Sequence, residues 1–176
     1  IVCLEDIIEE IVGDIQDEFD NEREDIINLG KDTWLIDARE NLSDQVHPDN
    51  EYAQRVEGEY GKTEMWYIVD CEDNAELIYG FKEEITKDEF RYAIENNTLL
   101  ERINSVSVKK GDVFFIKSGT LHAIGKGILI AEIQQNSNTT YRVYDYGRIG
   151  ADGKPRELHI EKAIDVTELR PAENYE

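Results

Sequence analysis

The first part of the chain carries a helical pattern of apolar positions. Apolar residues recur at steps of three and four, and acidic residues fill most of the places between them. This spacing predicts an amphipathic helix over roughly residues 4–18 with a single apolar stripe. The stripe consists of Leu4, Ile7, Ile8, Ile11, Val12, Ile15 and Phe19. A charged linker over residues 20–25 follows, and then two short strands are predicted on either side of a turn at residues 30–32.

From residue 62 to residue 144 the pattern changes to alternation and to dense β-branched and aromatic segments, which are typical of strands. Thr86 and Glu89 form a capping box, which predicts the start of a helix there. That helix would bury Phe90, Ala93 and Ile94, and a second short helix would carry Leu99, Leu100 and Ile103. The expected fold is therefore mainly β: a closed barrel with a short helical insertion and an N-terminal amphipathic helix.

Charge divides the chain unevenly. The formal net charge is −21, and the first 30 residues contain eleven acids and one base. This change in composition predicts a boundary, with an acidic helix and a two-stranded appendage in residues 1–40 and a barrel domain in residues 41–176. Nucleic acid and anionic membranes are not expected as partners, because both would be repelled.

Two further features predict a cytoplasmic location. No apolar run approaches the ~20 residues needed to cross a bilayer, and no signal peptide is evident. Cys3 and Cys71 do not suggest a disulfide framework, which favours a reducing compartment.

The segment Gly111–Gly125, GDVFFIKSGTLHAIG, places His122 just after a glycine turn between two predicted strands. Its spacing resembles the second conserved motif of the cupin superfamily, whose fold is a double-stranded β-helix, or jelly-roll, barrel. Lys117 stands where that family usually has proline, which makes the turn less rigid but leaves the histidine in place.

Four segments of the chain resemble the catalytic region of type I mannose-6-phosphate isomerase in its short bacterial form. They are NLSDQVHPDNEYA, GKTEMWYIVDC, IKSGTLHAIGKGILIAEIQQNSNTTYRVYDYGR and PRELHIEKAIDV, and they extend over about residues 41–168. The family's N-terminal strands and its second cupin-like region are not included. Asp44 also replaces the usual aliphatic residue between Ser43 and Gln45.

The first 40 residues resemble a different family. IVCLEDIIEEIVGDIQDEFD, with the following LGKDTWLIDAR, is similar to the junction between a CBS domain pair and the transporter-associated domain of hemolysin-like transport proteins. The matching piece includes neither domain in full, so no function is carried over from it.

Strand parity predicts a polar barrel interior. Residues spaced by two on a strand share a face, which groups Ser43, Gln45 and His47, groups Lys62, Glu64 and Trp66, and groups Ser118, Thr120 and His122 if that segment is extended. Glu132 and Gln134 share a face, as do Thr140, Arg142 and Tyr144. An interior with histidines, carboxylates, Lys and Arg is costly to bury unless a metal and an anionic ligand offset the charges.

The isomerase resemblance implies one Zn²⁺ per chain, held by Gln45, His47, Glu64 and His122. It also implies a catalytic Arg142, with Glu132 and Lys62 as candidates for substrate contact or proton transfer. Ser43 and Arg148 fall where the family binds phosphate, Asp145 and Tyr144 are expected to shape the pocket, and His159 is interpreted as structural. The general base is not assigned.

The implied function is zinc-dependent interconversion of mannose 6-phosphate and fructose 6-phosphate through an enediol, with a phosphorylated sugar as the only expected partner. Two alternatives stay open at this point. One is a metal- and sugar-phosphate-binding cupin without turnover, and the other is a transport-associated regulatory fragment. The oligomeric state is not predicted.

Overall fold

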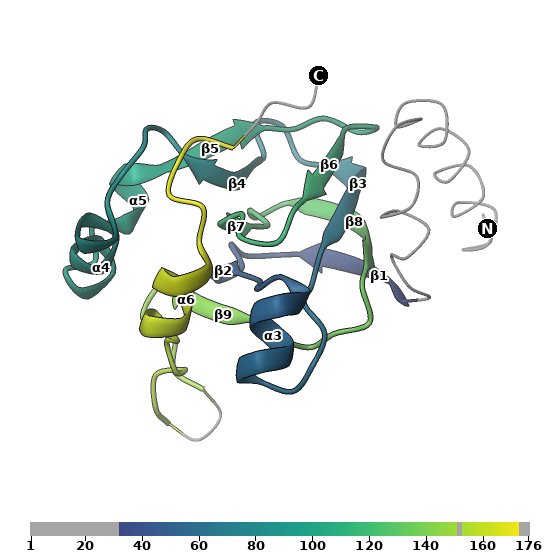
Figure 1. Cartoon of the computed structure of the whole chain (residues 1–176). Coiled ribbons are helices and arrows are strands. Elements are labelled where there is room, and N and C mark those ends of the chain that lie inside the picture. Colours follow the sequence, from purple (N-terminus) through teal and green to yellow (C-terminus); the bar gives the residue numbers. More distant parts are fainter. Residues whose placement is uncertain (1–31, 151–152, 173–176) are drawn as a thin grey trace.

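The structure, a computed structural model, describes residues 32–150 and 153–172 (Figure 1). The strands in these residues are β1 (Asp32–Ala38), β2 (Asp44–Val46), β3 (Glu64–Cys71), β4 (Glu76–Phe81), β5 (Ile103–Ser107), β6 (Val113–Ile116), β7 (His122–Ala123), β8 (Ile128–Gln134) and β9 (Tyr141–Tyr144). The helices are α3 (Asn50–Val56), α4 (Lys87–Glu95), α5 (Leu99–Arg102) and α6 (Ile160–Val166). The helix predicted over residues 4–18 and the strand and turn predicted before residue 32 lie outside the described residues.

Two antiparallel sheets form the barrel. The four-stranded sheet has the order β1-β8-β3-β6, and the five-stranded sheet has the order β5-β4-β7-β2-β9. Neighbouring strands in these sheets are mostly distant in sequence, as in a jelly roll, where chain crossovers alternate between two facing sheets. The mainly β barrel expected from the sequence is confirmed, and its helices lie together at the left and lower centre of Figure 1.

Strand β1 lies on the N-terminal side of the boundary predicted at residue 40. It nevertheless pairs with β8 along its whole length, from Asp32 opposite Gln134 to Ala38 opposite Ile128. Residues 32–38 are thus the edge strand of the four-stranded sheet. A strand in this segment is expected from its alternation, whereas its partner, almost one hundred residues later, is decided by the closure of the sheet.

The core is divided into layers. Between the two sheets lies an apolar cluster that includes Trp66, Ile68, Leu77, Ile116 and Ile130. A second cluster packs the five-stranded sheet against the helices and includes Val46, Phe81, Phe90, Leu121, Val143 and Ala163. Each methylene that these clusters remove from water contributes about 0.8 kcal/mol. Val46 of β2 and Val143 of β9 belong to this second cluster, so apolar side chains cover the helix-facing side of these strands.

The helical insertion is confirmed. In α4 the Thr86 hydroxyl accepts a hydrogen bond from the Glu89 backbone N–H at 3.2 Å, and the Glu89 carboxylate accepts one from the Thr86 N–H at 2.8 Å. This reciprocal pair satisfies two backbone donors at the helix start. The predicted apolar face of α4 is buried, and α5 buries Leu99, whereas Leu100 is 41% exposed. Ile103, predicted in this second helix, instead begins β5.

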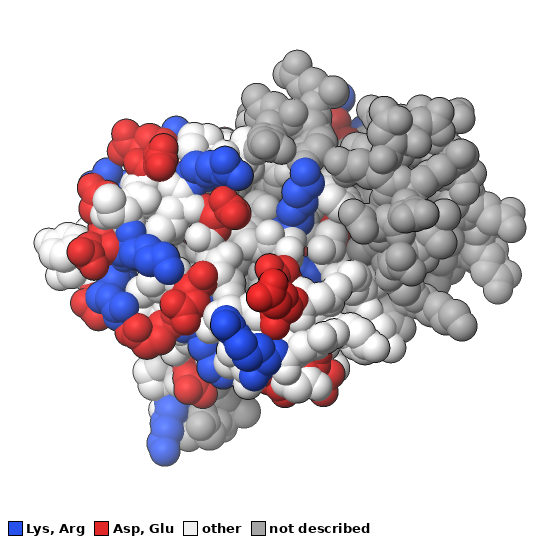
Figure 2. Space-filling model, viewed as in Figure 1, with Lys and Arg blue, Asp and Glu red and all other residues white. Residues whose placement is uncertain are grey.

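Charges of both signs lie side by side on the described part of the surface in Figure 2. Several form exposed ion pairs, such as Arg102 with Glu83 at 3.0 Å and Lys109 with Asp112 at 3.2 Å. Pairs of this kind contribute little to stability, typically about 0–1 kcal/mol each. Within the described segments, every helix is too short or too polar to cross a lipid bilayer.

Two glycines of the segment Gly111–Gly125 are required by the backbone. Gly119 has a φ of +88°, in the left-handed region that favours glycine. Gly125 follows β7, and a Cβ added there would lie 1.7 Å from the carbonyl oxygen of Glu76 on β4. The close approach of these two backbones leaves no room for a side chain.

Gly125→Ala should therefore destabilise the fold strongly, by about 3 kcal/mol or more, because the backbone of β4 or β7 must shift to admit a methyl group. Gly58→Ala is the control. Gly58 also has a positive φ, +73°, but nothing lies within 4 Å of an added Cβ, so only backbone strain of about 1–2 kcal/mol is expected. Urea unfolding of both variants measures the difference. Equal destabilisation would mean that β4 and β7 are not packed this closely.

Candidate metal centre

Strand register brings polar side chains from both sheets to one place inside the barrel. Gln45 on β2 lies directly opposite His122 on β7 and next to Arg142 on β9. On the facing sheet, Glu64 on β3 lies opposite Gln134 on β8. Directly opposed residues in antiparallel strands project to the same face. His47 follows the end of β2 and completes the group.

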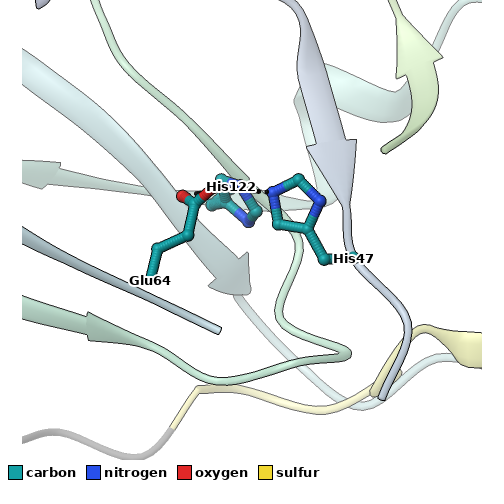
Figure 3. Close-up of side chains that lie close together, drawn as sticks. All are labelled: His47, Glu64 and His122. Atoms are coloured by element: carbon teal, nitrogen blue, oxygen red, sulfur yellow. Dashed lines mark ion pairs between the residues drawn. The ribbon is translucent and has the colours of Figure 1, made fainter. Parts of the chain in front are cut away.

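His47, Glu64 and His122 come from three separate segments and point toward one another (Figure 3). One ligand atom from each lies within 4.8 Å of the others, and all three side chains are buried. His47 Nε2 is 3.0 Å from Glu64 Oε1, and His122 Nε2 is 3.7 Å from Glu64 Oε2. Among the described residues this is the group of histidines and carboxylates that could hold a metal ion.

Backbone carbonyls orient both imidazoles. His47 Nδ1 lies 2.9 Å from the carbonyl oxygen of Thr139, and His122 Nδ1 lies 2.8 Å from that of Thr120. A carbonyl only accepts hydrogen bonds, so each Nδ1 carries the proton. In the neutral imidazole, each Nε2 then presents a lone pair toward Glu64.

His47 Nε2 and Glu64 Oε1 are consequently two hydrogen-bond acceptors that face each other at 3.0 Å. Both atoms are fully buried and lack a hydrogen-bond partner of good geometry, although the Lys62 ammonium lies 2.6 Å from Glu64 Oε1 on one side. Such an arrangement is unfavourable unless a positive charge lies between the atoms. The donor set therefore fits a divalent cation, with imidazole nitrogens and a carboxylate of the kind that bind transition metals.

The remaining titration behaviour agrees with this fit. Burial and the neighbouring His47 lower the pKa of His122 to about 4, which keeps its imidazole neutral. Burial opposes ionisation of Glu64, but neighbouring positive charge, including the Lys62 ammonium at 2.6 Å, holds its pKa well below the usual range. A neutral imidazole at His122 and an ionised carboxylate at Glu64 are protonation states that suit metal binding.

Gln45 lies beside this group with its amide nitrogen toward the metal site. Its Nε2 is 3.4 Å from His122 Nε2, to which it can donate a hydrogen bond. A metal would be bound by the amide oxygen, and rotation of the amide about its last torsion angle exchanges the two atoms. Gln45 is therefore close enough to act as a fourth ligand, but in this structure its amide nitrogen rather than its oxygen lies toward the site.

A second carboxylate shares the neighbours of Glu64. The indole N–H of Trp66 lies 3.0 Å from Glu64 Oε2 and 3.0 Å from Glu132 Oε2, so the two carboxylates share this donor. Lys62 Nζ is 2.6 Å from Glu64 Oε1 and 4.0 Å from Glu132 Oε1. Burial and the charge of Glu64 raise the pKa of Glu132 to about 7. One carboxylate thus stays ionised while the other can exchange a proton near neutral pH.

The predicted phosphate and catalytic residues lie at the edge of this interior. Arg142 is half-buried, and its Nε donates to Ser43 Oγ at 3.4 Å. Arg148 donates to the Asn41 carbonyl and to Asp145 Oδ1 at 3.3 Å, and its guanidinium stacks on Tyr146 at 5.1 Å. Ser43 and Arg142 are therefore in contact, whereas Arg148 is held by partners of its own.

The segment before β7 is not extended. Thr120 N donates to the Lys117 carbonyl across a turn, and Ser118 and Thr120 line a separate surface pocket of about 230 Å³. The shared face suggested for Ser118, Thr120 and His122 is therefore absent, because the turn at Gly119 breaks the alternation. His159 lies at the start of α6, where its Nδ1 accepts the Arg142 backbone N–H.

Sequence reasoning assigned no role to Trp66 and noted Asp44 only as an exception. Trp66 is two residues after Glu64, so strand alternation places both on the face toward the barrel interior. Its hydrogen bond to Glu132, however, depends on the pairing of β3 with β8. Asp44 is 0% exposed, and neither carboxylate oxygen has a hydrogen-bond partner. Burial raises its pKa to about 7, although the charge of Arg148 acts in the opposite direction.

A two-sheet barrel with a His, Glu and His cluster at its centre has the fold of the cupin class and a site that fits a metal ion. The chain is 55% identical over 138 residues to mannose-6-phosphate isomerase ManA of Bacillus subtilis. The crystal structure of the mannose 6-phosphate isomerase from B. subtilis has a TM-score of 0.77 at 41% identity over 90% of this chain. A zinc-bound mannose 6-phosphate isomerase structure, at 12% identity and a TM-score of 0.59, shares the fold. The resemblance expected from the sequence is confirmed.

These matches cover only part of the relatives. The chain spans 44% of ManA and 52% of the B. subtilis crystal structure. A second, short match is also present: 44 residues are 48% identical to hemolysin C of Brachyspira hyodysenteriae, 16% of that protein. No protein-family model matches the chain.

The buried, unpartnered carboxylate of Asp44 predicts a pH-dependent stability. Its pKa is raised from 3.8 to about 7 in the folded chain, so folding favours the protonated form. The stability that this form contributes is fully present below pH ~4 and is lost as the pH rises toward 7. The loss is on the order of 4 kcal/mol for a shift of this size.

Asp44→Asn should therefore stabilise the chain at pH 8 much more than at pH 4, as measured by urea unfolding at both values. The control is Asp37→Asn, since the Asp37 side chain is 62% exposed beside Arg39 and should respond little. A gain for Asp44→Asn that is the same at both pH values would show that its carboxylate does not change protonation on folding.

Proposed function

We propose that the chain is the metal-binding part of a mannose-6-phosphate isomerase, which interconverts mannose 6-phosphate and fructose 6-phosphate. The observation that carries the proposal is the pair of buried acceptors, His47 Nε2 and Glu64 Oε1, at 3.0 Å. The similarity to enzymes of that name supplies the substrate. Because sugar phosphates are metabolites of the cytoplasm, we propose that compartment as well.

One Zn²⁺ would be held by His47, Glu64, His122 and, after rotation of its amide, Gln45. Two imidazoles, a carboxylate and an amide oxygen suit zinc with one further position open. A zinc-bound relative with this fold supports that choice. When bound, the ion supplies Lewis-acid polarisation of the sugar oxygens.

The isomerisation moves a proton between C1 and C2, so it requires a group that exchanges protons and a positive group that stabilises an enediolate. Glu132, whose pKa is raised to about 7, suits proton transfer near neutral pH. Lys62 lies between Glu132 and Glu64, so its ammonium would stabilise the Glu132 carboxylate whenever that group has given up its proton. Arg142 would offer its cationic fork to the developing oxyanion.

Phosphate recognition would fall to Ser43 and Arg148 at the rim of the barrel. A serine hydroxyl and a guanidinium are both good phosphate donors. Arg148 is held on Tyr146 and by Asp145, which orients its guanidinium before a ligand arrives and lowers the entropic cost of binding.

A metal- and sugar-phosphate-binding protein without turnover is the second candidate. The observation that favours it is coverage, since the chain spans about half the length of the isomerases it resembles. Both candidates require the same metal and the same phosphate contacts, so only an isomerase assay separates them. A transport-associated role depends on the short hemolysin C match, which covers 25% of this chain and 16% of that protein.

Metal content is the first test. The purified chain should bind about one Zn²⁺, because the site has a single set of ligands. His122→Ala should lose most of that zinc and should melt at a lower temperature, since an ion bound only by the folded chain stabilises it. His159→Ala is the control, because the His159 side chain contacts the Arg142 backbone and the Tyr141 ring and is not part of the His47, Glu64 and His122 group. Full zinc content in both His47→Ala and His122→Ala would refute the assignment.

Arg142 should affect turnover more than binding. Its charge is required only as the enediolate forms, so Arg142→Ala should lower kcat by roughly 10²–10³-fold. Arg142→Lys should recover only part of this, because an ammonium lacks the planar fork. Arg148→Ala should instead raise KM, since phosphate is bound in the ground state and the transition state alike.

Steady-state formation of fructose 6-phosphate by the zinc-loaded chain measures these effects. A parent chain that binds mannose 6-phosphate but does not turn it over would establish the non-catalytic candidate. An active parent with an equally active Arg142→Ala variant would instead show that Arg142 does not face the substrate.

A further inference from the structure

The turn before β7 contacts both histidines of the proposed metal site. This turn, residues 117–120, is named the histidine turn here, and a backbone hydrogen bond of 3.0 Å joins its two ends. The Gly119 N–H donates to the His47 carbonyl at 2.8 Å. His122 Nδ1 donates to the Thr120 carbonyl, also at 2.8 Å. Two neighbouring residues of one turn therefore position the backbone of His47 and the ring of His122.

The histidine turn has little rigidity of its own. It reads KSGT and contains no proline that would fix a backbone angle. Gly119 at its centre belongs to the residue type with the most backbone freedom. A metal, however, tolerates a change of only about 0.2 Å in the distances to its ligands. The position of the turn therefore depends on contacts from other parts of the chain.

The segment that follows α6 supplies such a contact. Residues 167–172 are named the C-terminal brace here, and they form the yellow trace that leaves α6 in Figure 1. The Glu168 N–H donates to the Gly119 carbonyl at 2.8 Å. A Cβ added at Gly119 would lie 3.0 Å from the Val166 carbonyl oxygen and 3.2 Å from Glu168 Cγ. The brace thus contacts the histidine turn directly, with little space for a side chain between them.

The brace is itself anchored on both sides of Glu168. Before it, helix α6 packs on β9 and α4, and the Thr167 hydroxyl donates to the Ala163 carbonyl at 2.6 Å. After it, the Leu169 carbonyl accepts the Ile85 N–H at 2.8 Å. Because the brace is fixed to two separate parts of the fold, it can restrain the turn that it contacts.

We propose that the C-terminal brace is a positioning element of the metal centre. The Glu168 N–H holds the histidine turn, and the turn holds the separation of His47 and His122. This inference deepens the proposed function, because it concerns the same metal site. The Glu168 side chain takes no part, since it is 61% exposed and pairs with Arg170 at 3.2 Å. The positioning group is a backbone donor that acts through the turn.

Replacement of the Glu168 N–H by an ester oxygen tests the restraint. This ester variant, made with the α-hydroxy acid analogue of glutamate, removes the donor and keeps the side chain. The matched control, Glu168→Ala, removes the side chain and keeps the donor. In the metal-free chain, amide hydrogen exchange at Gly119 should be roughly 3–10-fold faster in the ester variant, the ratio expected for one lost hydrogen bond. Exchange at Gly119 in the control, and at Gly111 in a separate turn, should not change.

Zinc affinity tests the connection from the brace to the site. The ester variant should bind zinc roughly 10-fold more weakly than the parent, as is typical when a group that orients a metal ligand is lost. Its Co²⁺ absorption spectrum should also differ, because the ligand geometry changes. Glu168→Ala should match the parent in both. Glu168→Pro also lacks the N–H and should behave as the ester variant does. Thr167 before it has a ψ of 131°, which is the extended conformation that a following proline requires.

The results separate this inference from the proposed function. Equal exchange at Gly119 in the ester variant and in Glu168→Ala would overturn the inference, as would faster exchange with unchanged zinc affinity. A parent chain that binds no zinc would instead refute the proposed metal site. The brace would then be judged in the metal-free chain by the nuclear Overhauser effect between the His47 and His122 rings, whose centroids are 4.8 Å apart. An effect of equal strength in the parent and the ester variant would overturn the inference without any metal.

Discussion

The centre of this protein depends on an unfavourable contact between two buried acceptors. His47 Nε2 and Glu64 Oε1 lie 3.0 Å apart, and the Thr139 carbonyl keeps the imidazole proton on the far nitrogen. In a buried site, little water is present to screen the repulsion between a lone pair and a carboxylate. A cation between the two atoms turns this repulsion into two attractions. The barrel can therefore be viewed as a rigid frame that keeps these atoms in place for a metal.

The rigidity has an identifiable source. Glu64 lies on β3, which is paired on both sides by β6 and β8, and Gln45 and His122 lie on β2 and β7 of the facing sheet, each of which is also paired on both sides. Strand β7 has only two residues, so its position depends on its neighbours β2 and β4 rather than on its own propensity. The close backbone approach at Gly125 is part of the same arrangement. Ligand geometry is thus a property of strand register, which a one-residue slip would destroy.

Local charge and total charge act differently in this chain. The net charge of −21 opposes an anionic ligand at long range, but solution salt screens exposed charges beyond about 8 Å. Lys62, Arg142 and Arg148 lie close to the site, within the barrel or at its rim. Their positive charges are only partly screened by salt, because they are partly shielded from solvent. Asp44 adds a negative charge among these positive ones. Its buried carboxylate has no hydrogen-bond partner and lowers the stability of the fold near neutral pH. Attraction of a sugar phosphate is therefore decided by a few neighbouring residues.

The sequence by itself determined the class of structure and the candidate ligands. Alternation along strands predicted the barrel, the Thr86 capping box predicted α4, and parity placed Gln45 with His47 and Glu64 with Trp66, because these rules depend only on neighbouring residues. Only the tertiary structure decided which strands meet. Pairing of β1 with β8, contact between Arg142 and Ser43, and the two carboxylates shared by Trp66 join residues that are many tens of positions apart. The turn at Gly119 was predicted, but that it takes Ser118 and Thr120 off the face of His122 is seen only in the structure. Whether Asp44 is paired also depends on distant neighbours, and the domain boundary near residue 40 stays a prediction. Periodicity is a local property of a chain, whereas register and burial arise only when the sheets close.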